Sequence, residues 1–143
     1  MSNSILCAID ISHPDKDNKV LEAAAKLAVM DDAQLDVITV VPDFGTSLVS
    51  GFFNEEHKEQ IISEAKQSLK KQVIKVVGED FDKKVRHIIA FGKTYQEVLK
   101  VAEKTEPSMI VVGAHKPDFS DYLLGANAAR IIRHSKCTVH VVR

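Results

Sequence analysis

Five apolar runs of strand length alternate with segments of helical periodicity along the chain. The runs cover residues 5–9, 35–41, 85–91, 109–112 and 138–142. Between them, apolar residues recur every three or four positions, which predicts helices over residues 16–30, 54–77, 94–103 and 125–134. This alternation predicts an α/β fold, with a parallel sheet, right-handed crossovers and helices on both faces.

The same pattern predicts which residues face the core and where elements end. Residues 5–9 and 109–112 are almost unbroken apolar runs, as expected for central strands covered on both faces. In the last helical segment we expect Ala128, Ile131 and Ile132 to point inward. Gly78 is predicted to end the second helix, and Pro42, which cannot donate to a sheet ladder, to end the second strand.

Length and charge narrow the class of protein. A chain of 143 residues fits one domain, here residues 1–143, that buries a core without disulfides or metals. With 19 Lys and Arg against 20 Asp and Glu, no net field attracts nucleic acid or an anionic membrane. The first apolar run is too short for a signal segment or a membrane span. We therefore expect a cytoplasmic protein, with no nucleic-acid or membrane partner.

The chain has two cysteines, Cys7 in the first apolar run and Cys137 just before the last. Two thiols this far apart in the sequence do not suggest a disulfide framework or a metal site. We expect both to be reduced and at least partly buried.

The segment from Gly113 to Arg143 carries the clearest functional pattern. A glycine ends a strand, a polar loop follows, and Gly125 opens a helix that leads to the final strand. This layout places free backbone N–H groups and the positive end of a helix dipole at the carboxyl edge of a sheet, where open α/β folds bind phosphates. A nucleotide is the first ligand to consider.

Each candidate residue also has a structural interpretation. Asp10 follows a strand, where ligand carboxylates lie in this fold, but it can also be a turn or cap residue. Gly113 and Gly125 can serve a tight turn and a helix cap. Lys116 can reach a phosphate or remain a solvated loop lysine, and Asn127 can contact a phosphate or cap the helix.

Several segments resemble the universal stress protein family. They are Ile-Leu-Cys-Ala-Ile-Asp-Ile-Ser at positions 5 to 12, Thr39-Val40-Val41-Pro42, Phe91-Gly92-Lys93 and residues 109–143, so the similarity covers essentially the full chain. The stretch Leu123-Leu124-Gly125-Ala126-Asn127 and the later Arg133-His134 look closest to the small bacterial F- and G-type branch. The resemblance implies a Rossmann-like (adenine nucleotide alpha hydrolase-like) open sheet of five strands in order 3-2-1-4-5. It also implies a homodimer through the strand Thr138–Val142.

In many members of this family ATP binds at the carboxyl ends of strands one and four. The resemblance implies ATP as ligand here, with ADP and AMP as alternatives. It places Asp10 near the ribose or the metal end of the nucleotide, with Mg²⁺ as the accompanying ion at Asp10. Ala8 and Val40 match positions that flank the adenine, although on sequence alone each can equally be core. The implied nucleotide contacts are Ala8, Ile9, Asp10, Val40, Val112, Gly113, His115, Lys116, Gly125, Ala126 and Asn127.

The chain departs from the family's glycine motif, Gly-x2-Gly-x9-Gly-Ser/Thr. Lys116 stands at the second glycine and is followed by Pro117; Gly125 comes one residue early, and Ala126 replaces the hydroxyl residue. These departures affect phosphate binding rather than the fold, because the strand, loop and helix start are retained. We expect Lys116 to compensate by reaching the β- or γ-phosphate.

Three functions follow from these observations. The first is a dimeric stress-response protein that binds ATP and reports on adenylate supply; the second is a dimeric adaptor of the same fold that has lost the nucleotide. An adenylating enzyme is the third, but Ile11-Ser12-His13-Pro14 follows Asp10 where such enzymes need a Ser-Gly-rich loop or a His-x-Gly-His pair. We assign no catalytic residue, so any hydrolysis or self-modification is expected to be slow.

Overall fold

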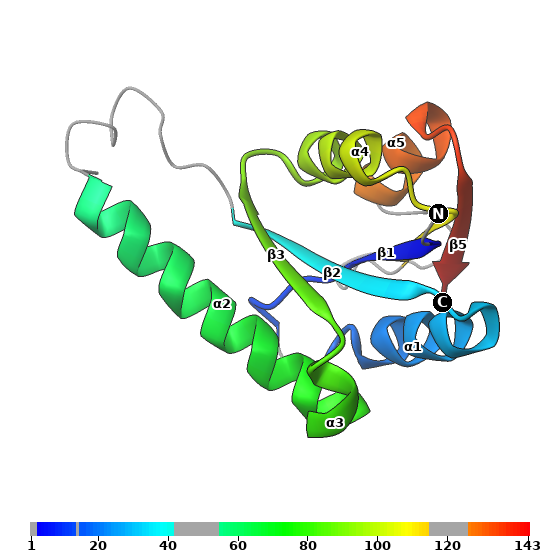
Figure 1. The fold of residues 1–143 in the computed structure, drawn as a ribbon. Helices are drawn as coiled ribbons and strands as arrows, with labels where there is room; N and C mark the ends of the chain where they lie inside the picture. The colour runs from blue at the N-terminus through cyan, green and yellow to red at the C-terminus, as the bar shows by residue number, and fades with distance from the viewer. Residues whose placement is uncertain (1–2, 14, 42–54, 115–125) are drawn as a thin grey trace.

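A parallel five-stranded sheet forms the centre of the molecule (Figure 1). The computed structural model describes residues 3–13, 15–41, 55–114 and 126–143. The strands are β1 (Ser4–Ala8), β2 (Gln34–Val41), β3 (Arg86–Phe91), β4 (Met109–Gly113) and β5 (Thr138–Val142). Their order is β3-β2-β1-β4-β5, which confirms the predicted order and puts β3 and β5 at the edges.

Five helices are described, and four of them match the helical segments of the sequence. These are α1 (Asn18–Asp31), α2 (Glu55–Val77), α4 (Thr94–Thr105) and α5 (Ala126–His134). The fifth, α3 (Glu79–Asp82), was not predicted, because four residues are too few to show a helical period. Gly78 separates α2 from α3 with φ of 90°, a backbone conformation that glycine adopts readily.

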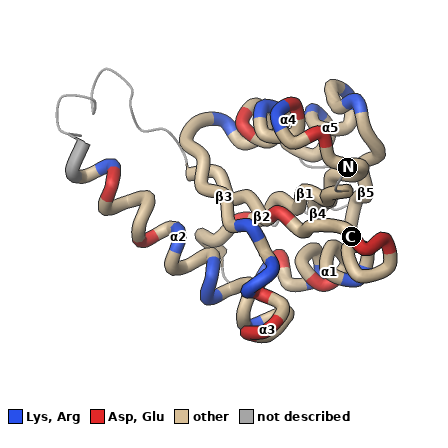
Figure 2. Tube along the Cα trace, in the orientation of Figure 1, with Lys and Arg blue, Asp and Glu red and all other residues tan. Residues whose placement is uncertain are grey.

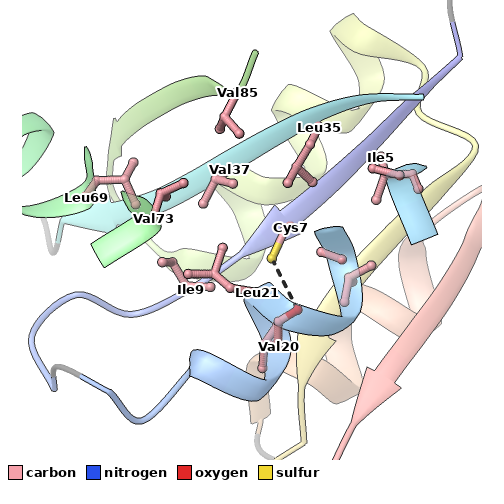
Figure 3. Packing of buried hydrophobic residues seen from close by; sticks show 13 residues of the cluster. Ile5, Cys7, Ile9, Val20, Leu21, Leu35, Val37, Leu69, Val73 and Val85 are labelled. Atoms are coloured by element: carbon pink, nitrogen blue, oxygen red, sulfur yellow. Dashed lines mark hydrogen bonds between the residues drawn. The ribbon is translucent and has the colours of Figure 1, made fainter. Parts of the chain in front are cut away.

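The helices cover both faces of the sheet, as predicted. Figure 1 shows α1, α2 and α3 on one side and α4 and α5 on the other. On the first side, Leu21 of α1 and Leu69 of α2 pack with Cys7 in one buried cluster (Figure 3). On the other side, Val98 of α4 and Ile131 of α5 belong to a second cluster. Each face thus buries its own apolar layer, which explains the apolar runs of β1 and β4.

One predicted core residue was wrong. Ala128 and Ile131 of α5 are buried as expected, but Ile132 is 40% exposed. The buried positions of this nine-residue helix, Ala128 and Ile131, lie three apart on one face. Ile132 follows directly and lies at the edge of that face, where solvent reaches it.

Two buried carboxylates stabilise the side of the sheet near β3. Asp36 of β2 accepts hydrogen bonds from Nε and Nη2 of Arg86 on the neighbouring strand, at 2.8 and 2.9 Å. Asp82 of α3 lies 2.7 Å from Nζ of Lys70 and 2.6 Å from Nε2 of His87. Because both carboxylates are about fully buried, at 1% and 2% exposure, these partners offset the cost of removing a charge from water.

The two thiols are free, as predicted. Cys7 is fully buried, and its Sγ–H points to the carbonyl oxygen of Val20 at 4.0 Å (Figure 3). Burial, and secondarily the charge of Asp17, raise the pKa of Cys7 far above its ordinary value. Burial also raises the pKa of Cys137, which is half-buried.

Charged residues of both signs are distributed over the surface, in agreement with the balanced composition of the chain. Figure 2 shows acidic and basic residues interspersed along the helices on both sides of the sheet. Among the described helices, none is both long and apolar enough to cross a membrane.

Candidate functional site

A cleft of about 660 Å³ opens at the carboxyl edge of the sheet. The ends of β1, β2 and β4, the β1–α1 turn, α2 and the first turn of α5 all contribute to its walls. In the chain, β1 leads to β2 on one side, whereas β4 leads to β5 on the other, so the strand order reverses between β1 and β4. Ligands of open α/β folds bind at such a reversal, and the volume is typical of a small-molecule site.

Asp10 lies at the rim of this cleft in a tight local network. Its Oδ1 accepts hydrogen bonds from the backbone N–H of Ser12 at 2.9 Å and from the Ser12 hydroxyl at 2.6 Å. Its Oδ2 lies 3.3 Å from Nδ1 of His13, which is also 3.1 Å from the Ser12 hydroxyl. Burial alone would raise the pKa of Asp10, but the bonds from Ser12 and the nearby imidazole outweigh it and lower that pKa. Asp10 is therefore an ionised, oriented carboxylate at neutral pH, with 49% of its side chain exposed.

Asp17 fastens the start of α1 to the end of β1. Its Oδ2 accepts the backbone N–H of Asp10 at 2.7 Å. The other oxygen of Asp17 lies near Gly113 of β4: a Cβ added to Gly113 would be 3.5 Å from Oδ1 and 3.2 Å from Cγ2 of Val20. The close approach of α1 therefore explains why glycine fits at this strand end.

The floor of the cleft is apolar. Ala8, Val40 and Val112 come from the ends of three adjacent strands, and all of them belong to or pack against the second core cluster. Together they form a surface on which a flat ring can lie.

α2 forms a wall of the cleft that the sequence did not reveal. Ile61, Glu64, Ala65 and Ser68 line it along this helix. Ala65 is also part of the buried face, so the apolar period indicated only a core-facing helix. Glu64 and Ser68 were missed because a polar residue beside a buried face normally faces solvent.

The first turn of α5 completes the cleft opposite α2. Ala126 and Asn127 line it, and the first backbone N–H groups of a helix have no partners within the helix. The positive end of the α5 dipole at this point favours an anionic group.

The charged side chains of the cleft are mostly acidic. Among the described lining residues, Asp10, Asp17 and Glu64 carry carboxylates, and Lys16 carries the one ammonium group. Lys16 was not among the predicted contacts, because the sequence placed it at the start of the first helix, whereas α1 begins at Asn18.

The structure brings together all predicted contacts that it describes. Ala8, Ile9, Asp10, Val40, Val112, Gly113, Ala126 and Asn127 line the same cleft. His115, Lys116 and Gly125 lie outside the described residues. Four separate segments of the chain thus supply the predicted contacts of one site.

Within the described residues, no group of three or more His, Cys, Asp or Glu side chains is arranged to hold a metal ion. Mg²⁺ does not need such a cage, because it keeps several waters and is usually held by one or two carboxylates together with ligand phosphates. Asp10 fits that limited role, since half of its side chain is open to the cleft.

Comparison with known proteins connects this geometry to one family. The family model described as the universal stress protein family matches residues 1–143. Universal stress protein A homolog 1 of Coxiella burnetii is 32% identical over 143 residues, covering 96% of this chain and 94% of that protein. Universal stress protein G of Escherichia coli O157:H7 is 27% identical over 145 residues, covering 100% of both.

Solved structures show the same fold. The protein MJ0577 matches with a TM-score of 0.73 at 25% identity, covering 99% of this chain and 96% of that one. A universal stress protein solved in complex with cAMP gives 0.64 at 18% identity, covering 99% and 97%. One from Archaeoglobus fulgidus in complex with dAMP gives 0.62 at 16%, covering 100% and 98%.

Proposed function

We propose that this chain, which belongs to the universal stress protein family, binds an adenine nucleotide in the cleft at the carboxyl edge of its sheet. One observation carries the proposal. Eight residues that the family resemblance implied as nucleotide contacts line one cleft, at the point where the strand order reverses. Two structures of the same fold that hold cAMP and dAMP support an adenine nucleotide as the class of ligand.

Each wall then has a role. Ala8, Val40 and Val112 contact the adenine ring, because they form the apolar floor. Asp10 accepts hydrogen bonds from the ribose, since its oriented carboxylate can exchange solvent contacts for hydroxyl donors. The backbone N–H groups at Ala126 and Asn127 bind the phosphates at the start of α5.

ATP accompanied by Mg²⁺ is the form we propose. The three carboxylates among the described lining residues repel a bare triphosphate, and a divalent cation reduces that repulsion. Asp10 would hold Mg²⁺ when it is bound, and the ion would supply positive charge against the phosphates. We assign no catalytic role to any residue of the cleft.

Calorimetry with AMP, ADP and ATP, each with and without Mg²⁺, tests the proposal. Ala126→Asp puts a carboxylate where the phosphates bind, and should abolish ATP binding while the fold is retained. Ala129→Asp is the matched control, because Ala129 is an exposed residue of the same helix outside the cleft lining. Absence of heat with all three nucleotides at millimolar concentration would overturn nucleotide binding and favour the adaptor function. Equal binding by both variants would move the site elsewhere.

We further propose that the protein works as a homodimer in the cytoplasm, where it reports adenylate supply during stress. β5 is an edge strand, and an edge strand offers unpaired backbone groups to another chain. Antiparallel pairing of two copies of Thr138–Val142 would satisfy them. Light scattering should give the mass of a dimer for the wild type and of a monomer for Val141→Pro, with circular dichroism confirming that the variant is folded. A monomeric wild type at tens of micromolar would contradict the dimer.

A further inference from the structure

A second cavity lies at the opposite end of the sheet from the cleft. It has a volume of about 400 Å³ and is bounded by the C-terminal ends of α4 and α5 and by the residues that lead into β4 and β5. Its inner surface is apolar, with Leu99 and Ala102 from α4 and Ile110 from β4. Ile110 is fully buried, so the cavity reaches down to the core of the domain.

The rim of this second cavity carries opposite charges on two sides. Glu103 and Glu106 come from the end of α4, and Lys136 follows the end of α5. In the described part of the chain, these three side chains form no salt bridge with one another or with other residues. A cavity thus separates two carboxylates from an ammonium group, and a ligand that carries both charges can bridge them.

The backbone strengthens the acidic side. Glu106 caps α4 in the left-handed conformation, with φ of 47°, so the carbonyl end of this helix lies at the rim. The C-terminal end of a helix carries a partial negative charge and favours a cation. An ammonium group is therefore best placed beside Glu103 and Glu106, and a carboxylate beside Lys136.

We propose that this second cavity binds a free α-amino acid with an apolar side chain. The ammonium group of the ligand pairs with Glu103 and Glu106, its carboxylate pairs with Lys136, and its side chain packs against Leu99 and Ala102. The volume lies within the range of small-molecule sites. The proposal does not depend on nucleotide binding, because no residue lines both cavities.

Cys137 provides a direct readout, because it lines the second cavity and is only half-buried. Iodoacetamide labelling followed by mass spectrometry measures its alkylation rate, and the fully buried Cys7 serves as the internal standard for a folded protein. L-leucine or L-phenylalanine at ten times its dissociation constant should slow alkylation of Cys137 about tenfold. N-acetyl-L-leucine, which lacks the ammonium group, and L-leucine amide, which lacks the carboxylate, should protect far less.

Two variants test which side chains pair with the charged groups of the ligand. Glu103→Gln and Lys136→Gln should each weaken protection by L-leucine about three- to tenfold. Lys104→Gln is the control, because Lys104 is exposed on the same helix end but does not line the cavity. No protection by either amino acid at tens of millimolar would overturn the proposal. Equal protection by the acetylated or amidated ligand would also overturn it, since the cavity would then select apolar compounds without regard to charge.

Discussion

Asp10 and Asp36 lie near the same sheet but have opposite surroundings. Asp36 is 1% exposed, and both of its oxygens are bound by Arg86, a residue fifty positions away in the sequence. Asp10 is about half exposed and is held by Ser12 and His13, its close neighbours in the chain. The first carboxylate joins two strands, whereas the second is oriented by its own turn.

The contrast separates a carboxylate that holds the fold together from one that is open to a ligand. A buried carboxylate that is held by other elements of the fold cannot accept a ligand without breaking those bonds, and Asp82 belongs to the same type as Asp36. A carboxylate oriented by a local turn keeps free lone pairs, so it can bind a ligand at little structural cost. Changes in the two groups should therefore separate stability from binding.

The largest effect is expected at Asp82. Asp82→Ala leaves His87, which is 13% exposed, without its partner and should lower the free energy of unfolding by about 3 kcal/mol. Urea denaturation measures the loss. Asp80→Ala on the same helix is the control: its side chain is fully exposed, and the change should stay within about 0.5 kcal/mol. Similar losses in both variants would mean that the buried network does not stabilise α3.

The two lysines that are candidates for phosphate contacts come next. Lys116→Ala should weaken ATP about ten- to a hundredfold and AMP far less, because a charge-assisted hydrogen bond contributes about 1.5 to 3 kcal/mol. Lys16→Ala tests the alternative phosphate contact, since the structure places Lys16 in the cleft. Lys19→Ala, an exposed lysine outside the cleft lining, is the control. Equal weakening of ATP and AMP by a lysine variant would exclude that lysine as a β- or γ-phosphate contact.

Asp10→Asn should weaken ATP about tenfold and change the free energy of unfolding by less than about 1 kcal/mol. Asp36→Asn should do the reverse, because it removes the charge of a buried carboxylate that is paired with Arg86, and it leaves the cleft intact. Calorimetry and urea denaturation on both variants measure the two effects. If Asp10→Asn lost stability and kept ATP affinity, its turn would be structural and the contrast with Asp36 would fail.

The smallest effect is expected in the loss of stability at acid pH. Burial raises the pKa of Asp10, but hydrogen bonds lower it more; at Asp15, the bond from Lys75 is the main cause of a lowered pKa. A folded-state pKa below the ordinary value of 3.8 stabilises the protein above that pH, and the contribution is lost as the pH falls through the folded-state value. Thermal unfolding below pH 4 should therefore decline less steeply for Asp10→Asn than for Asp31→Asn, an exposed control. Identical slopes would show that the Asp10 turn does not contribute.

The strands were predictable because each is a short apolar run between helical periods, and parallel sheets bury such strands on both faces. The strand order came from the family resemblance instead. α3 was not predictable, since Glu79 to Asp82 reads as a charged loop. Burial of Asp82 depends on Lys70 and His87, which lie twelve and five residues away, so no local pattern indicates it.

At the site, strand ends were predictable and helix walls were not. Asp10 and Gly113 follow apolar runs, and the carboxyl ends of parallel strands meet at one edge. Glu64 and Ser68 face the cleft because of how α2 crosses the sheet, which depends on tertiary packing rather than on the helical period. The role of Asp17 depends on its bond to the backbone of Asp10, which sequence does not show.

Gly113 has a consequence for comparing related chains. Val20 of α1 lies close beside it, so a Cβ at this position would be 3.2 Å from Cγ2 of Val20 and that side chain would have to shift. That constraint acts in the empty protein as much as in the liganded one. A lineage that abandoned nucleotides should still retain glycine at this position, and should be free to vary Ala126 and Asn127. In a comparison of related chains, retention of Ala126 and Asn127 would therefore indicate ligand binding, whereas retention of Gly113 would not.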